Sequence, residues 1–271
     1  MVIGNLYLCP TPIGNLEDIT LRVLRILKEV DFIAAEDTRQ TVRLLNHYEI
    51  KKPLISYHEH NKVSSGIKIV NELKLGKNVA LVTDAGTPGI SDPGKDLVKL
   101  CIDENINVIP LPGPTAITTA LIGSGLDTNE FTFMGFLPTK KKDREEVINN
   151  IFHEKRTVII YEAPHRIIDT LNEFKPYAGD RKIVIARELT KIHEEFIRGT
   201  IDEVLSKIGN EVKGELVVLV EGFKEVINLS PEELIKKYID SGIDKKEAVK
   251  LTAKKLGIPK SEVYKLTLND K

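Results

Sequence analysis

An eleven-residue stretch from Asp84 to Gly94 contains three glycines, two prolines and two aspartates. Glycine allows a backbone to approach a ligand closely, and proline fixes the shape of a loop. The stretch follows the apolar run 79–83, which is typical of a buried strand, and α/β proteins bind ligands at the carboxyl ends of such strands. We therefore predict a ligand-binding loop, because a simple turn would not require so many of these residues.

Two common phosphate-binding loops do not match this stretch. The pattern Gly-x-Gly-x-x-Gly of dinucleotide-binding proteins occurs nowhere in the sequence. Residues 89–95 match Gly-x4-Gly-Lys, but Asp96 follows where a P-loop has Ser or Thr. Within this segment Asp92 would repel a phosphate, and Pro93 lacks an amide donor. The sequence thus favours a ligand with an adenosine and an amino acid but no phosphate, and S-adenosylmethionine fits this description.

The elements that must position this loop alternate between short β-rich runs and helical patterns. Such alternation predicts a largely parallel sheet with helices on both faces. The expected strands are 6–9, 32–35, 79–83 and 108–111. The helices that follow them, in the same order, are 21–30, 38–48, 95–102 and 116–122.

A second set of elements begins after residue 129. Its expected strands are 131–136, 157–161, 182–186, 196–198 and 216–220, and its expected helices are 144–153, 166–174 and 201–207. The strand pair around residues 188–196 is too close for a helical crossover, so we predict a mixed sheet in this part of an α/β protein.

The C-terminal part is Lys-rich and helical, with no strand pattern. From Ser230 onward ten Lys stand against seven Asp and Glu, a local net charge of +3. Ser230-Pro-Glu-Glu233 and Asp244-Lys-Lys-Glu247 fit capping boxes, and Gly242 and Gly257 fit helix ends, so three short helices are predicted. Residues 248–268 look like a helix-turn-helix. One interpretation of this segment is a structural bundle that supports the second domain or a dimer.

Length and composition describe an ordinary globular chain. Its 271 residues suffice for two domains, and a net charge of −1 gives no global signal for nucleic acid or membranes. Cys9 and Cys101 lack metal-ligand spacing and are expected to be free thiols in the core, which suggests a reducing compartment. The N-terminus has no signal-peptide pattern, and no apolar run approaches about 20 residues. We therefore expect a soluble cytoplasmic protein without membrane association.

Eight motifs occur in order along the chain. They are Thr11 to Asp18, Glu36 to Arg39, Tyr57 to Asn61, Asp84 to Gly94, Pro112 to Ala116, Gly135 to Pro138, Tyr161 to Arg166 and Arg187 to Lys191. Together they closely resemble the bacterial small-subunit ribosomal RNA (cytidine-2′-O)-methyltransferases, which are members of the tetrapyrrole methylase superfamily. The resemblance covers nearly the whole chain, including the helical tail, which would then be a second contact with RNA or the ribosome.

This resemblance implies two α/β domains, residues 1–125 and 126–226, with S-adenosylmethionine folded into the cleft between them, followed by a helical segment, 227–271. By the same likeness both domains would contact the cofactor. The implied contact residues are Pro12, Gly14, Asp84, Gly86, Thr87, Gly89, Ile90, Thr115 and Ala116 in the first domain, and Glu162, Ala163, Arg187, Leu189 and Glu215 in the second. The first-domain stretches all follow predicted strands, which agrees with a site at the strand ends.

The implied chemistry limits the catalytic candidates. Transfer of a methyl group from a sulfonium to a ribose hydroxyl requires in-line alignment and removal of the hydroxyl proton, without a metal. The candidates are Glu36, Asp37, Arg39 and His58. A carboxylate or imidazole would accept the proton, and Arg39 would hold a phosphate or orient a carboxylate. Alternatively, Asp37 or the residue after it simply caps the next helix.

Basic residues beside the expected cleft are the candidates for RNA contact. Lys140, Lys141, Lys142 and Arg144 form a cluster on a predicted loop, and His165 and Arg166 follow a strand end. A phosphate backbone suits such a cluster, although charge runs are often just solvated, and the His-Arg pair could instead start a helix. His58 and His60 would share one face of a strand without a third metal ligand, so RNA contact or local hydrogen bonding is preferred and no metal is predicted.

The resemblance also implies a homodimer that acts on ribosomal RNA in assembled small subunits. Two alternatives stay open at this point. One is a methylase of a corrin or porphyrin, against which the Lys-rich loop and the tail argue. The other is a noncatalytic ribosome-assembly factor, against which the retained glycines of residues 84–94 argue.

Overall fold

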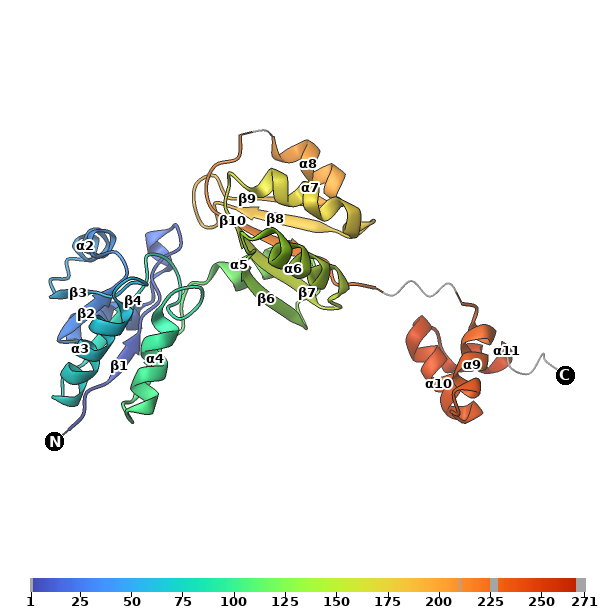
Figure 1. The fold of residues 1–271 in the computed structure, drawn as a ribbon, viewed down its shortest axis with the longest axis horizontal. Helices are drawn as coiled ribbons and strands as arrows, with labels where there is room; N and C mark the ends of the chain where they lie inside the picture. The colour runs from blue at the N-terminus through green and yellow to red at the C-terminus, as the bar shows by residue number, and fades with distance from the viewer. Residues whose placement is uncertain (1, 210, 225–228, 267–271) are drawn as a thin grey trace. The chain divides into compact units, whose positions relative to one another are not determined.

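The computed structural model describes residues 2–209, 211–224 and 229–266 (Figure 1). The chain divides into two compact units, Met1–Phe223 and Lys224–Lys271. The first unit holds both β-sheets and the second is helical. The predicted boundary between residues 226 and 227 lies outside the described residues, and the division of the first unit near residue 125 stays a prediction.

The first sheet consists of five parallel strands in the order β3-β2-β4-β1-β5. The strands are β1 (Leu6–Leu8), β2 (Phe32–Ala35), β3 (Leu54–Ser56), β4 (Val79–Val82) and β5 (Val108–Pro110). Ala34 and Leu81 belong to one core cluster and Ile33 and Ala80 to the other, because successive side chains of a strand point to opposite faces. Helices α3 (Lys62–Lys74) and α4 (Gly94–Asp103) cover one face, and α1 (Leu21–Glu29) and α2 (Thr38–His47) cover the other.

The predicted parallel sheet is therefore confirmed, with two additions. Strand β3 and helix α3 were not among the expected elements, and they supply the edge of the sheet and part of one covering layer. β3 has only three residues, all half-buried, and α3 contains Gly66 and exposes Val63, so neither element carries a strong hydrophobic period. A short 3₁₀ helix, Leu16–Asp18, also precedes α1.

The second sheet is mixed, as predicted, with the order β6-β7-β10-β8-β9. Its strands are β6 (Phe131–Phe136), β7 (Thr157–Glu162), β8 (Ile183–Arg187), β9 (Glu195–Gly199) and β10 (Leu216–Val220). Only β6 and β7 pair in parallel, and β8 and β9 form the expected antiparallel pair. Helices α6 (Lys141–His153), α7 (Ile167–Ala178) and α8 (Ile201–Ile208) cover one face of this sheet.

Helix α5 (Ala116–Ser124) covers the opposite face of the second sheet (Figure 1). Its residues Ile117 and Leu121 share a core cluster with Ile159 and Val217, and Ile13 from the loop after β1 joins the same cluster. Segments that follow first-sheet strands thus pack directly against the second sheet. This packing brings loops of both sheets to one place.

The helical unit contains the three predicted helices, α9 (Pro231–Asp240), α10 (Lys245–Leu256) and α11 (Lys260–Leu266). They pack around Ile235, Val249 and Val263. The Ser230 capping box is complete, whereas Asp244 accepts amide hydrogens without a reciprocal bond from Glu247. Residues 267 and 268 of the predicted helix-turn-helix lie outside the described residues. In the described ranges every helix is too short or too polar to span a bilayer.

Candidate functional site

A cavity of about 520 Å³ is lined by residues that follow strands of both sheets. Its volume is in the range of about 300–1,000 Å³ that small-molecule sites occupy. Among the residues predicted to bind a cofactor, those that line this cavity are Asp84, Gly86, Thr87, Ile90, Thr115, Ala116, Glu162, Ala163, Leu189 and Glu215. Pro12 and Gly14 line a neighbouring cavity instead. Gly89 and Arg187 are not among the lining residues, and Arg187 pairs with Glu195 at 2.9 Å.

One wall of the cavity is the Asp84 loop, residues 84–94, which is held by a carboxylate of its own. Both oxygens of Asp92 accept the Gly89 amide hydrogen, at 3.0 and 2.8 Å, and Oδ2 also accepts that of Ile90 at 2.9 Å. Oδ1 further accepts the amide hydrogen of Gly94 at 2.7 Å. These amides are the donors that a P-loop would offer to a phosphate, and here they are already occupied by an anion. The geometry therefore supports a binding loop that does not bind phosphate.

Two glycines of this loop are required by the conformation of its backbone or by close packing. Gly86 and Gly89 have φ of 81° and 92°, a region that L side chains rarely adopt. A Cβ at Gly86 would also lie 3.2 Å from Cγ2 of Ile13. The hydroxyl of Thr87 donates to the carbonyl of Pro114 at 2.8 Å, which connects the loop to the segment before α5.

Of the four predicted catalytic residues, Glu36 lines the cavity. It follows β2 and is half-buried; burial and the neighbouring Asp84 carboxylate raise the pKa of Glu36 above its ordinary value. Asp37 instead caps α2 by accepting the Arg39 amide hydrogen and forms a two-point pair with the Arg39 guanidinium, at 3.1 and 2.7 Å. The side-chain hydrogen bond from Arg39 lowers the pKa of Asp37 to about 2. Asp37 and Arg39 therefore form a capping pair at the start of the helix.

His58 and His60 lie in the loop and turn after β3, so their expected placement on a strand is wrong. The strand ends at Ser56 because Asn61 accepts the His58 amide hydrogen and donates to the Ser56 carbonyl, which closes a turn. Nδ1 of His58 is buried and has no hydrogen-bond partner among the residues that the structure describes. In the described part of the chain no three His, Cys, Asp or Glu side chains are grouped to hold a metal ion.

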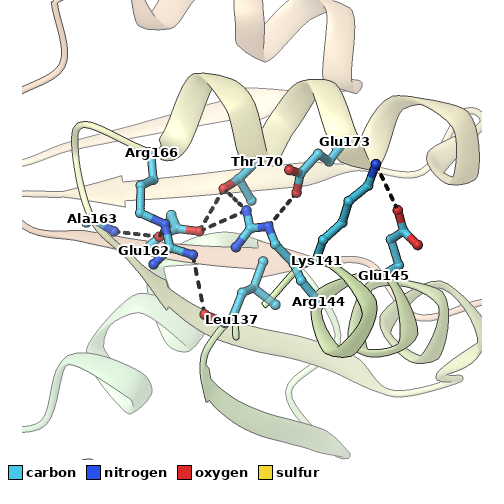
Figure 2. A network of polar contacts seen from close by, with 9 residues as sticks. All are labelled: Leu137, Lys141, Arg144, Glu145, Glu162, Ala163, Arg166, Thr170 and Glu173. Atoms are coloured by element: carbon cyan, nitrogen blue, oxygen red, sulfur yellow. Dashed lines mark hydrogen bonds and ion pairs between the residues drawn. The ribbon is translucent and has the colours of Figure 1, made fainter. Parts of the chain in front are cut away.

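The opposite wall is the Glu162 loop, residues 162–166, which is held by buried side chains (Figure 2). The Glu162 side chain is fully buried at the end of β7. Oε1 accepts the Ala163 amide hydrogen at 2.9 Å and lies 3.4 Å from Nε of Arg166, while Oε2 accepts the Thr170 hydroxyl at 2.7 Å. Arg144 lies 3.6 Å from Oε2 through Nη2.

Arg144 comes from α6 and is itself buried. It donates to Thr170 and Glu173, both at 2.6 Å, which connects α6 to α7 (Figure 2). A buried carboxylate needs such partners because an unpaired charge in the interior is strongly unfavourable. The network therefore fixes the backbone of Ala163, which lines the cavity.

The structure separates the predicted RNA-binding residues into two groups. Lys140, Lys141, Lys142 and His165 are exposed, whereas Arg144 and Arg166 contact Glu162. The lysines do not lie on a loop as expected, since Lys140 is the N-cap of α6 and the next two residues form its first turn. The helix begins three residues earlier than predicted because Lys and Asp are tolerated in a first turn.

A third wall is a turn with unusual backbone geometry. Glu188 and Thr190 have φ of 52° and 65°, which is uncommon for residues other than glycine. A Cβ at Gly14 would lie 2.8 Å from the Leu189 carbonyl, and one at Gly214 would lie 2.3 Å from the Glu188 carboxylate. These two glycines let segments of both sheets approach the turn closely.

Several lining residues were not assigned from the sequence. They are Thr83, Phe136, Tyr161, Pro164, Leu216 and Val217. Phe136 and Tyr161 lie with their ring centroids 5.4 Å apart at the ends of paired strands, and burial raises the pKa of Tyr161 to about 12. Both residues lie inside the motifs given above. An aromatic residue at the end of a strand, within such a motif, was therefore the sequence signal that could have identified them as lining residues.

The fold and the cavity define a class of proteins. Residues 5–205 match the family model described as tetrapyrrole (corrin/porphyrin) methylases, and the chain belongs to this family. Two relatives, from Halalkalibacterium halodurans and Bacillus subtilis, are both named ribosomal RNA small subunit methyltransferase I. The first is 48% identical over 97% of this chain and 94% of its own length, and the second is 50% identical over 96% and 93%.

Solved structures share the fold at low sequence identity. Diphthine synthase has a TM-score of 0.66 and 12% identity, covering 81% of this chain and 90% of its own. Uroporphyrin-III C-methyl transferase from Thermus thermophilus, complexed with S-adenyl homocysteine, has a TM-score of 0.57 and 15% identity over 80% and 97%. The predicted fold class is confirmed by these likenesses together with the family match.

The cavity fits S-adenosylmethionine by the chemistry of its walls. Ile13, Ile90, Phe136 and Tyr161 offer an apolar surface for an adenine ring, and backbone amides and carbonyls of the Asp84 and Glu162 loops offer polar partners. The Asp92 carboxylate occupies the amides that a phosphate would need. These residues suit a cofactor that carries a sulfonium and no phosphate.

Proposed function

We propose that this protein transfers a methyl group from S-adenosylmethionine to the 2′-oxygen of a cytidine in small-subunit ribosomal RNA. The observation that carries the proposal is that a phosphate-free binding loop and the half-buried Glu36 line the same cavity. The near full-length similarity to proteins named ribosomal RNA small subunit methyltransferase I supports the choice of substrate.

The cofactor supplies a methyl group on a positively charged sulfur. The Asp84 loop, the Glu162 loop and the segment Thr115–Ala116 hold it and exclude water from part of the cavity. Glu36 accepts the proton of the ribose hydroxyl as the new carbon–oxygen bond forms and the carbon–sulfur bond breaks. A carboxylate with a raised pKa is a stronger base than an ordinary one, which suits this role. Asp37 and Arg39 hold the start of α2, directly after Glu36.

The partner is the small ribosomal subunit, and the protein acts where ribosomes are assembled, in the cytoplasm, as a homodimer. The exposed Lys140, Lys141, Lys142 and His165 contact the phosphate backbone of the RNA. Arg144 and Arg166 act indirectly, by holding the Glu162 loop through their contacts with the buried carboxylate.

The test is methyl transfer from labelled S-adenosylmethionine to unmodified small subunits, with free ribosomal RNA in parallel, followed by alkaline hydrolysis. A 2′-O-methyl group prevents attack of that oxygen on the adjacent phosphate, so label in alkali-resistant dinucleotides is expected. Label in alkali-sensitive mononucleotides would indicate base methylation and would contradict the proposal. Cofactor binding without transfer to any RNA would favour a macrocycle substrate or an assembly role.

A further inference from the structure

A second cavity, of about 260 Å³, adjoins the cofactor cavity on the first-sheet side. The two cavities share Thr83 and Asp84 as lining residues. Beyond this shared wall, the second cavity is lined by the loop after β1 and by one side of α2. The lining residues are Thr11, Pro12, Gly14 and Leu16 from the loop and Gln40, Thr41, Arg43, Leu44 and His47 from the helix.

Basic side chains follow one side of α2. Arg39, Arg43 and His47 are spaced four residues apart, so they form a stripe along the helix. Arg39 is paired with Asp37. Arg43, by contrast, has no side-chain hydrogen bond or ion pair with any residue in the described ranges, and it is exposed. The cavity therefore has one uncompensated guanidinium and an imidazole in its wall.

The cavity is acidic at its other end. Asp84 lies at the start of α2, because its Oδ1 accepts the amide hydrogen of Asp37, the N-cap residue, at 2.9 Å. With a rise of 1.5 Å per residue, Arg43 and His47 are about 9 and 15 Å further along the helix. The loop after β1 follows the helix over this length, since the Tyr48 hydroxyl donates to the Leu16 carbonyl. The cavity thus leads from a basic end to a carboxylate at the border of the cofactor cavity.

We propose that this second cavity binds the ribose-phosphate of the RNA strand at the target nucleotide. The phosphate lies against Arg43 and His47, and the ribose lies toward Asp84, so that its 2′-hydroxyl faces the cofactor cavity and Glu36. At about 260 Å³ the cavity is smaller than most small-molecule sites, which suits one sugar-phosphate unit rather than a whole free ligand. This inference rests on the proposed function and assigns its substrate subsite.

The two cavities also differ in the groups that they offer to a phosphate. In the cofactor cavity Asp92 occupies the amides that a phosphate would need, whereas the second cavity presents a free guanidinium. An Arg side chain can donate two hydrogen bonds to one phosphate in a planar arrangement. The phosphate-bearing reactant and the phosphate-free reactant therefore have different places, and they meet at Asp84 and Glu36.

The test compares Arg43→Ala and His47→Ala with the control Arg22→Ala, which removes an exposed arginine from α1 that lines neither cavity. Methyl transfer to unmodified small subunits gives KM and kcat, filter binding to the same subunits at several salt concentrations gives the salt slope, and calorimetry gives the affinity for S-adenosylmethionine. Arg43→Ala is expected to raise KM about tenfold and to lower the salt slope by about 1, as for the loss of one phosphate contact. Arg43→Lys is expected to restore most of the salt slope, because it keeps the charge.

Unchanged KM and salt slope in Arg43→Ala, or equal changes in Arg22→Ala, would overturn the inference. A loss of S-adenosylmethionine affinity in Arg43→Ala with an unchanged KM for subunits would also overturn it, by assigning the cavity to the cofactor. Absence of methyl transfer by the wild-type protein would count against the proposed function alone. In that case a lower salt slope of Arg43→Ala in filter binding still supports the subsite, and an unchanged slope rejects it.

Discussion

The two walls of the cofactor cavity are held in shape by different means. The Asp84 loop is fixed locally, by glycines in left-handed conformations and by one carboxylate that accepts three amide hydrogens from residues at most three positions away. The Glu162 loop is fixed at long range, by a buried carboxylate whose partners include Arg144 of α6 and Thr170 of α7. The first wall lies beside the half-buried Glu36. The second wall contains Glu162, the only Asp or Glu that is buried among the described residues.

This difference indicates a division of tasks. The first wall presents backbone groups to the cavity beside the half-buried Glu36, and its interactions lie close to the protein surface. The second wall depends on charges inside the protein, and the removal of one buried partner leaves the other uncompensated. We therefore expect substitutions in the first wall to affect mainly activity and cofactor affinity, and substitutions behind the second wall to affect mainly stability.

The largest expected effect is that of Glu36→Gln on the rate. Loss of a general base typically lowers a rate by about 10²–10⁴-fold, and cofactor affinity should stay close to that of the wild type. Single-turnover methyl transfer and calorimetry measure the two quantities. A rate within about threefold of wild type would show that Glu36 is not the proton acceptor.

The same residue predicts the pH dependence. The base acts when ionised, so the wild-type rate should fall as the pH decreases through the raised pKa of Glu36, and this acid limb should be absent from Glu36→Gln. Because the pKa is higher in the folded than in the unfolded protein, the folded state binds more protons near that pH, and its stability decreases as the pH rises through this range. Glu36→Gln should therefore not lower the thermal midpoint at neutral pH. A clear decrease would contradict the proposed division of tasks.

Arg144→Ala should cause the largest loss of stability. Removal of one partner of a buried ion pair typically costs about 3–5 kcal/mol, and the Arg144 side chain is only 10% exposed. Urea unfolding monitored by circular dichroism measures this change, with Lys141→Ala as the control, because that side chain is 90% exposed on the same helix. A loss below about 1 kcal/mol would mean that the network is not required to hold the second wall.

Asp92→Ala should have an intermediate effect on stability and a clear effect on binding. Three amide hydrogens lose their acceptor, and because the loop is only partly buried, water can replace some of the bonds, so a cost of about 1–2 kcal/mol is expected. Cofactor affinity should fall about tenfold as the loop loses its shape. Asp103→Ala, at an exposed position of α4, is the control. Equal affinities of both variants would show that Asp92 does not shape the binding loop.

Gly89→Ala should have the smallest effect. A Cβ at this position would have no atom of the described residues within 4 Å apart from its two chain neighbours, so the cost comes from the positive φ of 92° and should be about 1 kcal/mol. Gly242→Ala, at φ 89° and equally free of neighbours, should lose the same stability without any change in cofactor affinity. If Gly89→Ala and Gly242→Ala bind the cofactor with equal affinity, Gly89 does not contribute to the shape of the first wall.

The sequence by itself determined the parts of this protein that depend on local interactions. The strand and helix periods predict the two sheets, Ser230 heads a capping box that the sequence predicts, and two glycines of the Asp84 loop have a positive φ. Each of these signals arises between residues a few positions apart, so spacing alone reveals it. The motifs likewise sufficed for the family, because they occur in order along one chain.

Only the tertiary structure decided which charged residues line a cavity and which are paired inside the protein. Arg144 follows three lysines and looks like one of them, yet it points toward Glu162, eighteen positions away, because α6 packs on the second sheet beside α7. Arg43 carried no motif, yet α2 and the loop after β1 make it part of a cavity. The physical reason is that burial and pairing of a charge depend on neighbours brought together by folding, which no local spacing records.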